Sequence, residues 1–420
     1  MEHDSILNLP PEITILIFHC CVDKPHIGHV YPPHNRGPLV LASVCRDWRN
    51  LCLSIGALWA SLRIYPAQYT TVRIKDLLQL LHLWLTRADP YPVDLHVFHS
   101  SWTGQIFRYL AKHSRKFGTL GVTINHPFYF PNRRIRGRVP TLTKLVVDFV
   151  RDREEPVLLS AFNDAPCLRE AHLSAASLQW ISLPWGQLTH LEFSNQIIAD
   201  CMEILRETPN VEVLRVISKG LQSISPSPPI VLPSLHTFEL CHDLHGQLLS
   251  YLTLPALRTL QLMSLASVNA PILAKVGSRS GWSPQSIRLT GMSPEAVALC
   301  LQSISSLEVV EICTLDWPAY DSSQWQPLIT LLANDNRLLP DLRALTLRGF
   351  TPNVLSLVDM IRSRRDGTRQ DVSQLAFFSL HLDDQRDRTD AMCEIHVQLR
   401  ALANEGLDVV LSGKVVMSTP

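Results

Sequence analysis

A short apolar pattern that recurs through most of the chain constrains its fold more than any other feature of the sequence. The pattern is apolar-x-x-apolar-x-apolar, as in Leu168/Ala171/Leu173, and it usually follows a proline or a polar turn. In the middle of the chain it returns every 20 to 26 residues. The first positions of these middle copies are Phe117, Leu142, Leu168, Leu188, Val211, Leu235 and Leu257.

The pattern predicts how its copies fold and pack. Alternating apolar positions at the end of each copy are typical of a β-strand. One copy is too small to bury its own apolar face, so neighbouring copies must stack. Such a stack predicts a curved solenoid with a parallel sheet on its concave side. Helices are expected between strands at residues 197–208, 293–301 and 354–362, the second with a serine cap followed by a proline.

Residues 59–413 resemble the leucine-rich-repeat proteins, whose repeats are about 20–29 residues long. The resemblance implies an α/β solenoid, closed by a tail at residues 414–420. Family members often place an asparagine three residues after the last strand leucine, but this chain has Ala176 and Gln196 in two of those slots. Copies beginning at Leu307, Leu342 and Leu375 are spaced more widely, which predicts long inserts or helices there. The alternative is a non-repetitive α/β domain whose strands share a leucine pattern.

The beginning of the chain follows a different pattern, that of two amphipathic helices. Pro10 and Pro11 fit the first turn of a helix, where a missing N–H has no partner to lose. Apolar residues recur at helical spacing over residues 13–21 and again over residues 41–52. Between them, residues 23–37 predict an inserted loop because they are rich in proline and glycine. Two such helices cannot bury both faces alone, so they need the rest of the chain or a partner.

This head, residues 5–64, resembles an F-box of the kind common in mushroom-forming fungi (basidiomycetes). The motifs that carry the resemblance are L-P-x-E-I from Leu9, V-C-x-x-W from Val44 and L-W at Leu58. Family members dock the F-box onto a Skp-type adaptor and thereby join a cullin–RING ubiquitin ligase. The alternative is an ordinary helical hairpin packed on the following domain. By the resemblance, the adaptor-binding side chains are Leu9, Pro10, Ile13, Leu16, Ile17, Val44 and Trp48.

Composition indicates a globular protein without a strongly charged partner. Hydrophobic residues make up 46% of the chain and charged residues 18%, and 38 basic residues balance 38 acidic ones. This balance argues against a nucleic acid as the partner. No apolar run approaches the roughly 20 residues of a membrane-spanning helix, and residues 1–4 lack the features of a signal peptide. With ten scattered cysteines, these features predict a reducing compartment, the cytoplasm and/or the nucleus.

No motif in the sequence predicts catalysis, a cofactor or a metal. The chain has no phosphate-binding G-x-x-x-x-G-K-[ST] loop, no G-x-G-x-x-G and no H-E-x-x-H. Residues 277–281 carry an arginine where a nucleophile elbow would carry serine. Histidines gather in the predicted loop, but the adjacent Cys20 and Cys21 lack the spacing of zinc ligands. We therefore expect a protein that is not an enzyme, although a deep pocket with a coupled acid, base or nucleophile would point to a hydrolase or transferase.

The sequence thus predicts a substrate-recognition subunit of an SCF-type ubiquitin ligase. In that role, catalysis occurs on other subunits, and the receptor raises the effective concentration of a protein substrate. The alternative is a leucine-rich-repeat scaffold that acts outside a ligase. The substrate is expected on polar positions beside the strand leucines, because their mixed charge suits a protein better than a nucleic acid. These positions are His172, Glu192, Arg215, Glu239, Gln261, Arg288, Glu311, Arg348 and His381.

Overall fold

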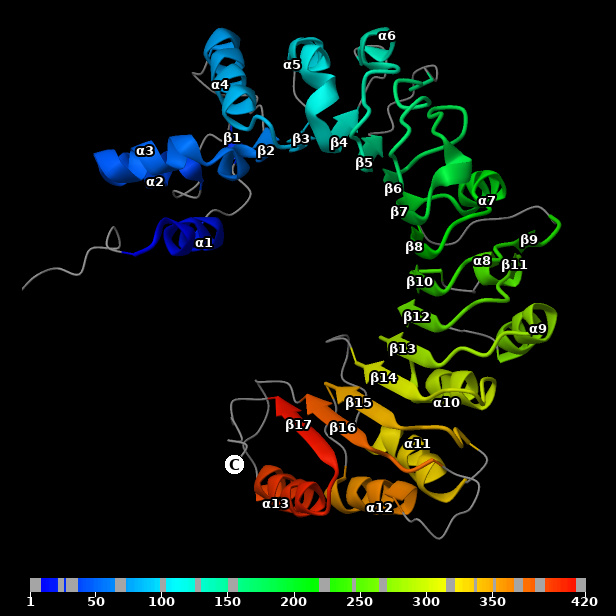
Figure 1. The fold of residues 1–420 in the computed structure, drawn as a ribbon. Helices are drawn as coiled ribbons and strands as arrows, with labels where there is room; N and C mark the ends of the chain where they lie inside the picture. The colour runs from blue at the N-terminus through cyan, green and yellow to red at the C-terminus, as the bar shows by residue number, and fades with distance from the viewer. Residues whose placement is uncertain are drawn as a thin grey trace, which may run out of the picture. The chain divides into compact units, whose positions relative to one another are not determined.

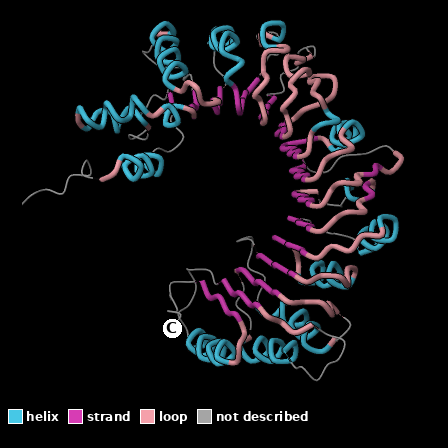
Figure 2. The backbone as a smooth tube through the Cα atoms, in the orientation of Figure 1, coloured by secondary structure: helices cyan, strands magenta, loops and turns pink. Residues whose placement is uncertain are grey.

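The computed structural model of the chain divides into two compact units, Met1–Ser194 and Asn195–Pro420. Each unit contains a parallel sheet, and within each unit the helices that connect the strands lie on one side of that sheet (Figure 1, Figure 2). The structure describes residues 9–21, 26–27, 37–64, 73–98, 103–124, 130–149, 158–218, 227–243, 247–263, 270–314, 322–335, 338–349, 353–365, 373–381 and 390–412.

The first unit begins with a helical head and continues as a sheet (Figure 1). The head contains α1 (Pro11–Cys21), α2 (Pro38–Val44), α3 (Arg46–Ser54) and the 3-10 helix η2 (Gly56–Trp59). The strands are β1 (His26–Ile27), β2 (Ser61–Ile64), β3 (Val93–Val97), β4 (Phe117–Ile124), β5 (Lys144–Phe149), β6 (Glu170–Ser174) and β7 (His190–Gln196). The connecting helices are α4 (Ile74–Arg87), α5 (Thr103–Leu110), η3 (Ala111–Lys116), α6 (Asn132–Ile135) and η5 (Trp185–Gln187).

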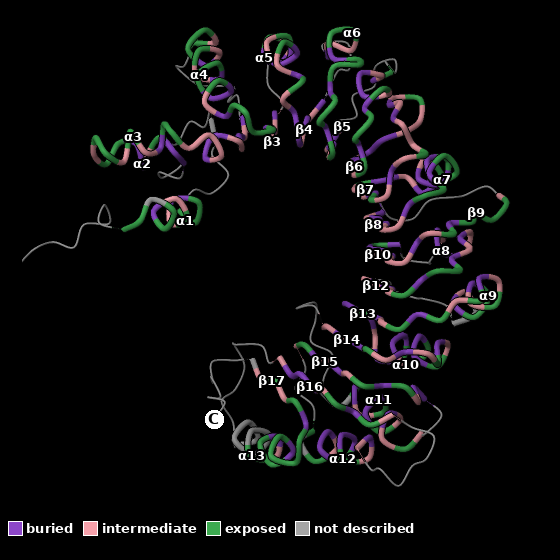
Figure 3. The backbone as a smooth tube through the Cα atoms, in the orientation of Figure 1, coloured by how far each residue is buried: buried purple, intermediate pink, exposed green. Residues whose placement is uncertain are grey.

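Each strand of the first unit pairs in parallel with the next strand along the chain, from β1 to β7. The register places the same pattern position side by side, so that Leu145 lies opposite Ala171 and Ala171 opposite Leu191. These apolar side chains are buried, while the residues between them stay partly accessible (Figure 3). This parallel pairing and burial confirm the predicted strands. The strands stack because each can bury its apolar positions only beside its neighbours.

The second unit repeats this arrangement. Its strands β8, β10 and β12 to β17 pair in parallel in that order, and β9 pairs with β11 in a separate small sheet. The strands are β8 (Val213–Ser218), β9 (Ile230–Val231), β10 (Thr237–Cys241), β11 (Leu252–Thr253), β12 (Thr259–Met263), β13 (Ser286–Thr290), β14 (Val309–Cys313), β15 (Ala344–Arg348), β16 (Phe377–His381) and β17 (Asp408–Ser412). The helices are α7 (Ile198–Glu207), α8 (Gln247–Ser250), α9 (Ala270–Ser280), α10 (Pro294–Gln302), α11 (Ser322–Asn334), α12 (Val354–Arg365) and α13 (Asp390–Asn404).

The helices expected between strands are present as α7, α10 and α12. Helix α10 begins as its sequence predicts, because the Ser293 hydroxyl accepts a hydrogen bond from the Ala296 N–H at 3.2 Å and Pro294 occupies the first turn. The wide spacing after Leu307 and Leu342 is filled by α11 and α12. No described helix has both the length and the apolar character needed to cross a membrane.

The structure corrects two expectations about the head. The apolar stretch over residues 41–52 is not one helix but two, because Cys45 between α2 and α3 is extended, with φ −153° and ψ 176°. The predicted loop at residues 23–37 contains the strand β1, whose His26 lies opposite Arg63 of β2. Most of the rest of that loop lies outside the described residues.

The predicted α/β class and its large parallel sheet are confirmed. The identities of the F-box and of the leucine-rich-repeat solenoid stay predictions, as do the sequence-based domain boundaries. The tail at residues 414–420 lies outside the described part of the chain.

Candidate functional site

One side of α1 and the stretch just before it carry apolar side chains that the rest of the unit leaves exposed. Leu9 is 39% exposed, Ile13 43% and Leu16 60%. The opposite side of the helix is buried through Thr14 and Phe18. Phe18 packs on Trp48 of α3 with ring centroids 4.9 Å apart, which fixes the side that α1 turns inward. The described part of the first unit therefore leaves an apolar row exposed on α1 and just before it.

The break between α2 and α3 leaves a further apolar side chain of the head, that of Val44, exposed to solvent. The Cys45 Sγ accepts a hydrogen bond from the Trp48 N–H at 3.4 Å, so Cys45 caps α3. Arg49 Nε donates to the Ala42 carbonyl at 2.8 Å and ties the two helices together. Val44, at the end of α2, is left 58% exposed.

The predicted adaptor-binding residues divide into two groups. The exposed group contains Leu9, Pro10, Ile13, Leu16 and Val44, whereas Ile17 and Trp48 are half-buried. Sequence reasoning missed two further exposed leucines of the head, Leu39 (45%) and Leu53 (38%). Helical spacing cannot find them, because it does not show which side of a helix the rest of the fold covers.

In the second unit, the predicted substrate-binding residues lie on the accessible face of the sheet. The register aligns Arg215, Glu239, Gln261, Arg288 and Glu311 across neighbouring strands, and Arg348 lies opposite His381. Arg215 Nε lies 3.0 Å from Glu239 Oε1. Glu311 bridges two guanidinium groups, at 2.6 Å from Arg288 Nη2 and 2.7 Å from Arg348 Nε.

These ion pairs keep the face charged and ordered without contributing much stability. The guanidinium side chains of Arg215, Arg288 and Arg348 are 42–47% exposed, and such pairs are typically worth only about 0–1 kcal/mol. His381 borders the row, and partial burial, with the charge of Arg348 in support, lowers the pKa of its imidazole. The arrangement can present fixed charges to a partner.

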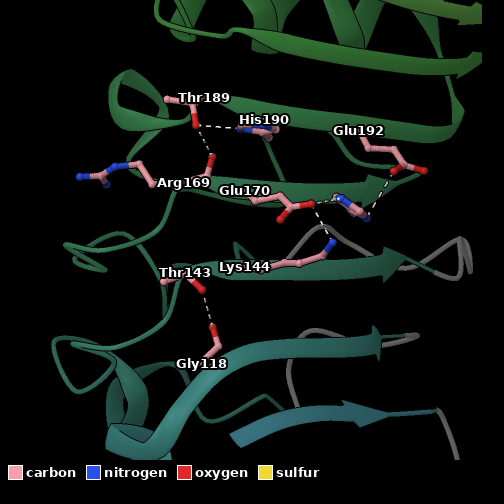
Figure 4. A network of polar contacts seen from close by, with 9 residues as sticks. Gly118, Thr143, Lys144, Arg169, Glu170, Thr189, His190 and Glu192 are labelled. Atoms are coloured by element: carbon pink, nitrogen blue, oxygen red, sulfur yellow. Dashed lines mark hydrogen bonds and ion pairs between the residues drawn. The ribbon is translucent and has the colours of Figure 1, made fainter. Parts of the chain in front are cut away.

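In the first unit, His172 and Glu192 lie opposite each other on β6 and β7. His172 Nδ1 is 3.4 Å from Glu192 Oε2, and His172 Nε2 is 2.8 Å from Glu170 Oε1 (Figure 4). Glu170 also pairs with Lys144 Nζ at 2.7 Å. Burial acts to raise the pKa of the Glu170 carboxyl, but hydrogen bonds from Lys144 and His172 outweigh it, so this pKa is lowered overall.

Sequence reasoning missed Lys144 and Glu170, although a signal for both was present. They occupy the accessible positions just before the strand apolar residues, as their burial patterns show. Applying the alternation rule to every accessible position of each strand, and not to one position per strand, would have included them.

The same face holds a hollow of about 270 Å³ between β3 and β7. It lies over β4 and β5, whose accessible positions within the hollow carry small or short side chains. Its lining residues include His96, Phe98, Gly121, Thr123, Val146, Asp148, His172, Ser174 and Ser194.

The buried thiols of Cys52, Cys241 and Cys300 are not prepared for nucleophilic chemistry. Burial raises the pKa of the Cys52 thiol to about 11 and that of the Cys300 thiol to about 12. Burial, with Glu239 nearby, likewise raises the pKa of the Cys241 thiol to about 12. A thiol with so high a pKa stays protonated near neutral pH, and the thiolate is the reactive form. Among the described residues, no group of three or more histidine, cysteine, aspartate or glutamate side chains could hold a metal ion.

The chain matches no known protein family, and no curated protein is significantly similar to it in sequence. The function of the chain must therefore be inferred from two of its surfaces, the exposed apolar row of the head and the polar faces of the sheets.

Proposed function

We propose that the protein is a non-catalytic substrate receptor of an SCF-type ubiquitin ligase. The head docks a Skp-type adaptor, and through it a cullin–RING ligase, while the polar sheet faces bind a protein substrate. No nucleic acid, membrane or cofactor takes part in this role.

One observation carries the proposal, namely the exposed apolar row formed by Ile13 and Leu16 on α1 and by Leu9 just before it, together with the exposed Val44 at the end of α2. Placing large apolar side chains in water is unfavourable by about 25 cal/mol per Å² of apolar surface. A contiguous exposed apolar patch commonly marks an interaction site. A scaffold whose head packs only internally would instead cover this side of α1, so the exposure favours docking over the scaffold hypothesis.

The proposal is tested by co-purification of the full chain with a Skp-type adaptor. We expect the wild type to capture the adaptor and Leu16→Arg to lose most of that capture, because a charge would replace the most exposed apolar contact of the row. Leu83→Arg is the matched control, because Leu83 on α4 is 48% exposed but lies outside the head.

Circular dichroism should show that both variants remain folded, since both side chains are exposed. Absence of capture by folded wild-type protein would overturn the ligase function and leave the scaffold hypothesis. Equal loss of capture in both variants would show that the α1 row is not the docking surface.

A further inference from the structure

The hollow on the first unit exists because one cross-strand row lacks large side chains in its middle. The register aligns His96, Gly121, Val146, His172 and Glu192 across β3 to β7. A Cβ on Gly121 would overlap the imidazole of His96, so glycine at this position leaves room for that ring over β4. The next row position, Val146, is short and partly accessible. The His96 ring thus covers Gly121, and Val146 forms the floor of the hollow between His96 and His172.

The side of the hollow formed by His172 is held in place by its neighbours. Glu170 contacts one imidazole nitrogen and Glu192 the other, at 2.8 Å and 3.4 Å (Figure 4). Lys144 in turn fixes Glu170. The hollow is thus bounded by a side chain whose orientation is set before any ligand arrives, which lowers the cost of ordering on binding.

The hollow is acidic. Asp148 lines it, and among the described residues no basic side chain pairs with this carboxylate. The accessible positions of β3 to β7 carry the carboxylates of Asp94, Asp148, Glu170 and Glu192, against the single ammonium of Lys144 in these described strands. The zero net charge of the whole chain therefore hides a local excess of negative charge on this face.

The size of the hollow limits what it can hold. Small-molecule sites usually enclose about 300–1,000 Å³, and this hollow, at about 270 Å³, lies below that range. It suits a single long side chain. Val146 offers an apolar floor for an aliphatic stem, and Asp148, with the hydroxyl groups of Thr123 and Ser174, offers hydrogen-bond acceptors at the polar end.

We propose that this hollow binds a lysine or arginine side chain of a protein partner, with its cationic end against Asp148 and its stem over Val146. The inference rests on the proposed receptor function for the identity of that partner as a substrate. It assigns the substrate a basic residue that enters between His96 and His172.

The test uses the full chain with its histidine rings labelled with carbon-13, so that NMR can follow the rings of His96 and His172. Each signal is assigned by its loss in His96→Gln or His172→Gln. The probes are blocked alanine pentapeptides that carry arginine, lysine, citrulline or glutamate in the middle. We expect saturable shifts of both signals with arginine and lysine only, since citrulline has the shape of arginine without its charge.

Asp148→Asn should weaken binding of the arginine peptide about tenfold, the loss expected for a hydrogen bond to a charged group. Asp164→Asn is the matched control, because Asp164 is an exposed carboxylate of the same unit paired with Arg136 outside the hollow. Val146→Phe fills the hollow and should abolish binding while Asp148 is intact, which provides a second test independent of the charge.

Absence of shifts with the cationic peptides, equal binding of citrulline or glutamate, or unchanged affinity in both Asp148→Asn and Val146→Phe would each overturn the inference. Adaptor capture is measured on the same variants. Retained capture with failed peptide binding would overturn this inference alone, whereas failed capture with retained peptide binding would overturn the ligase function alone.

Discussion

At the scale of single residues, Arg364 on α12 shows how this fold uses a buried charge. The residue is only 2% exposed. Its guanidinium donates to the main-chain carbonyls of Leu332 at 2.7 Å, Leu338 at 2.7 Å and Leu339 at 3.0 Å. These carbonyls belong to the end of α11 and the turn after it, where Leu339 has a positive φ of 55°. The side chain thus satisfies acceptors that the end of a helix leaves open.

Arg364→Met should lower the free energy of unfolding by about 3 kcal/mol, because the buried carbonyls lose their donors while the apolar volume is largely kept. Arg362→Met on the same helix should change it by no more than about 0.5 kcal/mol, because Arg362 is exposed. Urea unfolding of the two variants checks this difference. Equal effects would mean that the carbonyl contacts of Arg364 contribute nothing specific.

At the scale of elements, α1 is the helix whose two sides have different tasks. Its inner side attaches it to the head through Phe18, which is fully buried against Trp48. Its outer side, with Ile13 and Leu16, contributes little to that attachment because it is exposed. Attachment and docking can therefore be separated by substitution.

Phe18→Ala should release α1 from the head, because truncating a buried phenylalanine typically costs about 3–5 kcal/mol. Native-state hydrogen exchange should show faster exchange of the α1 amides, while the strands of the sheets keep their protection. Leu16→Ala is the control and should leave α1 protection unchanged. Comparable loss of protection in both variants would contradict this division between the two sides of the helix.

At the scale of the whole molecule, stability is distributed along the chain from neighbour to neighbour. Within each unit the strands of the main sheet pair with the strands next to them in the order of the chain, β1 to β7 in the first unit and β8, β10 and β12 to β17 in the second, and their apolar residues are buried side by side. Such an arrangement makes stability approximately a sum of unit terms and nearest-neighbour terms. Removal of a buried side chain from one strand should therefore destabilise the adjacent strands more than distant ones.

Leu289→Ala in β13 should lower the free energy of unfolding by about 2–5 kcal/mol, because Leu289 is fully buried. Hydrogen exchange should rise more in the neighbouring strands β12 and β14 than in β17, at the end of the same sheet. Leu299→Ala on α10 removes the same atoms from a side chain that is 43% exposed and should change little. A uniform rise in exchange across the second unit would contradict the neighbour-to-neighbour description.

Local sequence determined the repeated elements of this protein and where they start. Alternating apolar positions located the strands β4 to β8, because a strand has a period of two that needs no knowledge of its partners. Ser293 and Pro294 located the start of α10 for the same reason, since a cap acts within one turn. The polar positions chosen between strand leucines do lie on the accessible sheet faces, because alternation also fixes which side chains point away from the core.

Only the tertiary structure decided how these elements face one another and what their side chains form together. Residues 41–52 have one continuous helical period, yet the chain breaks at Cys45, because capping by its sulfur and packing of Trp48 on Phe18 outweigh helix continuity. The hollow needs Gly121, Val146 and Asp148 from neighbouring strands in one register. That register is a property of strand pairing, and no single stretch of sequence contains it.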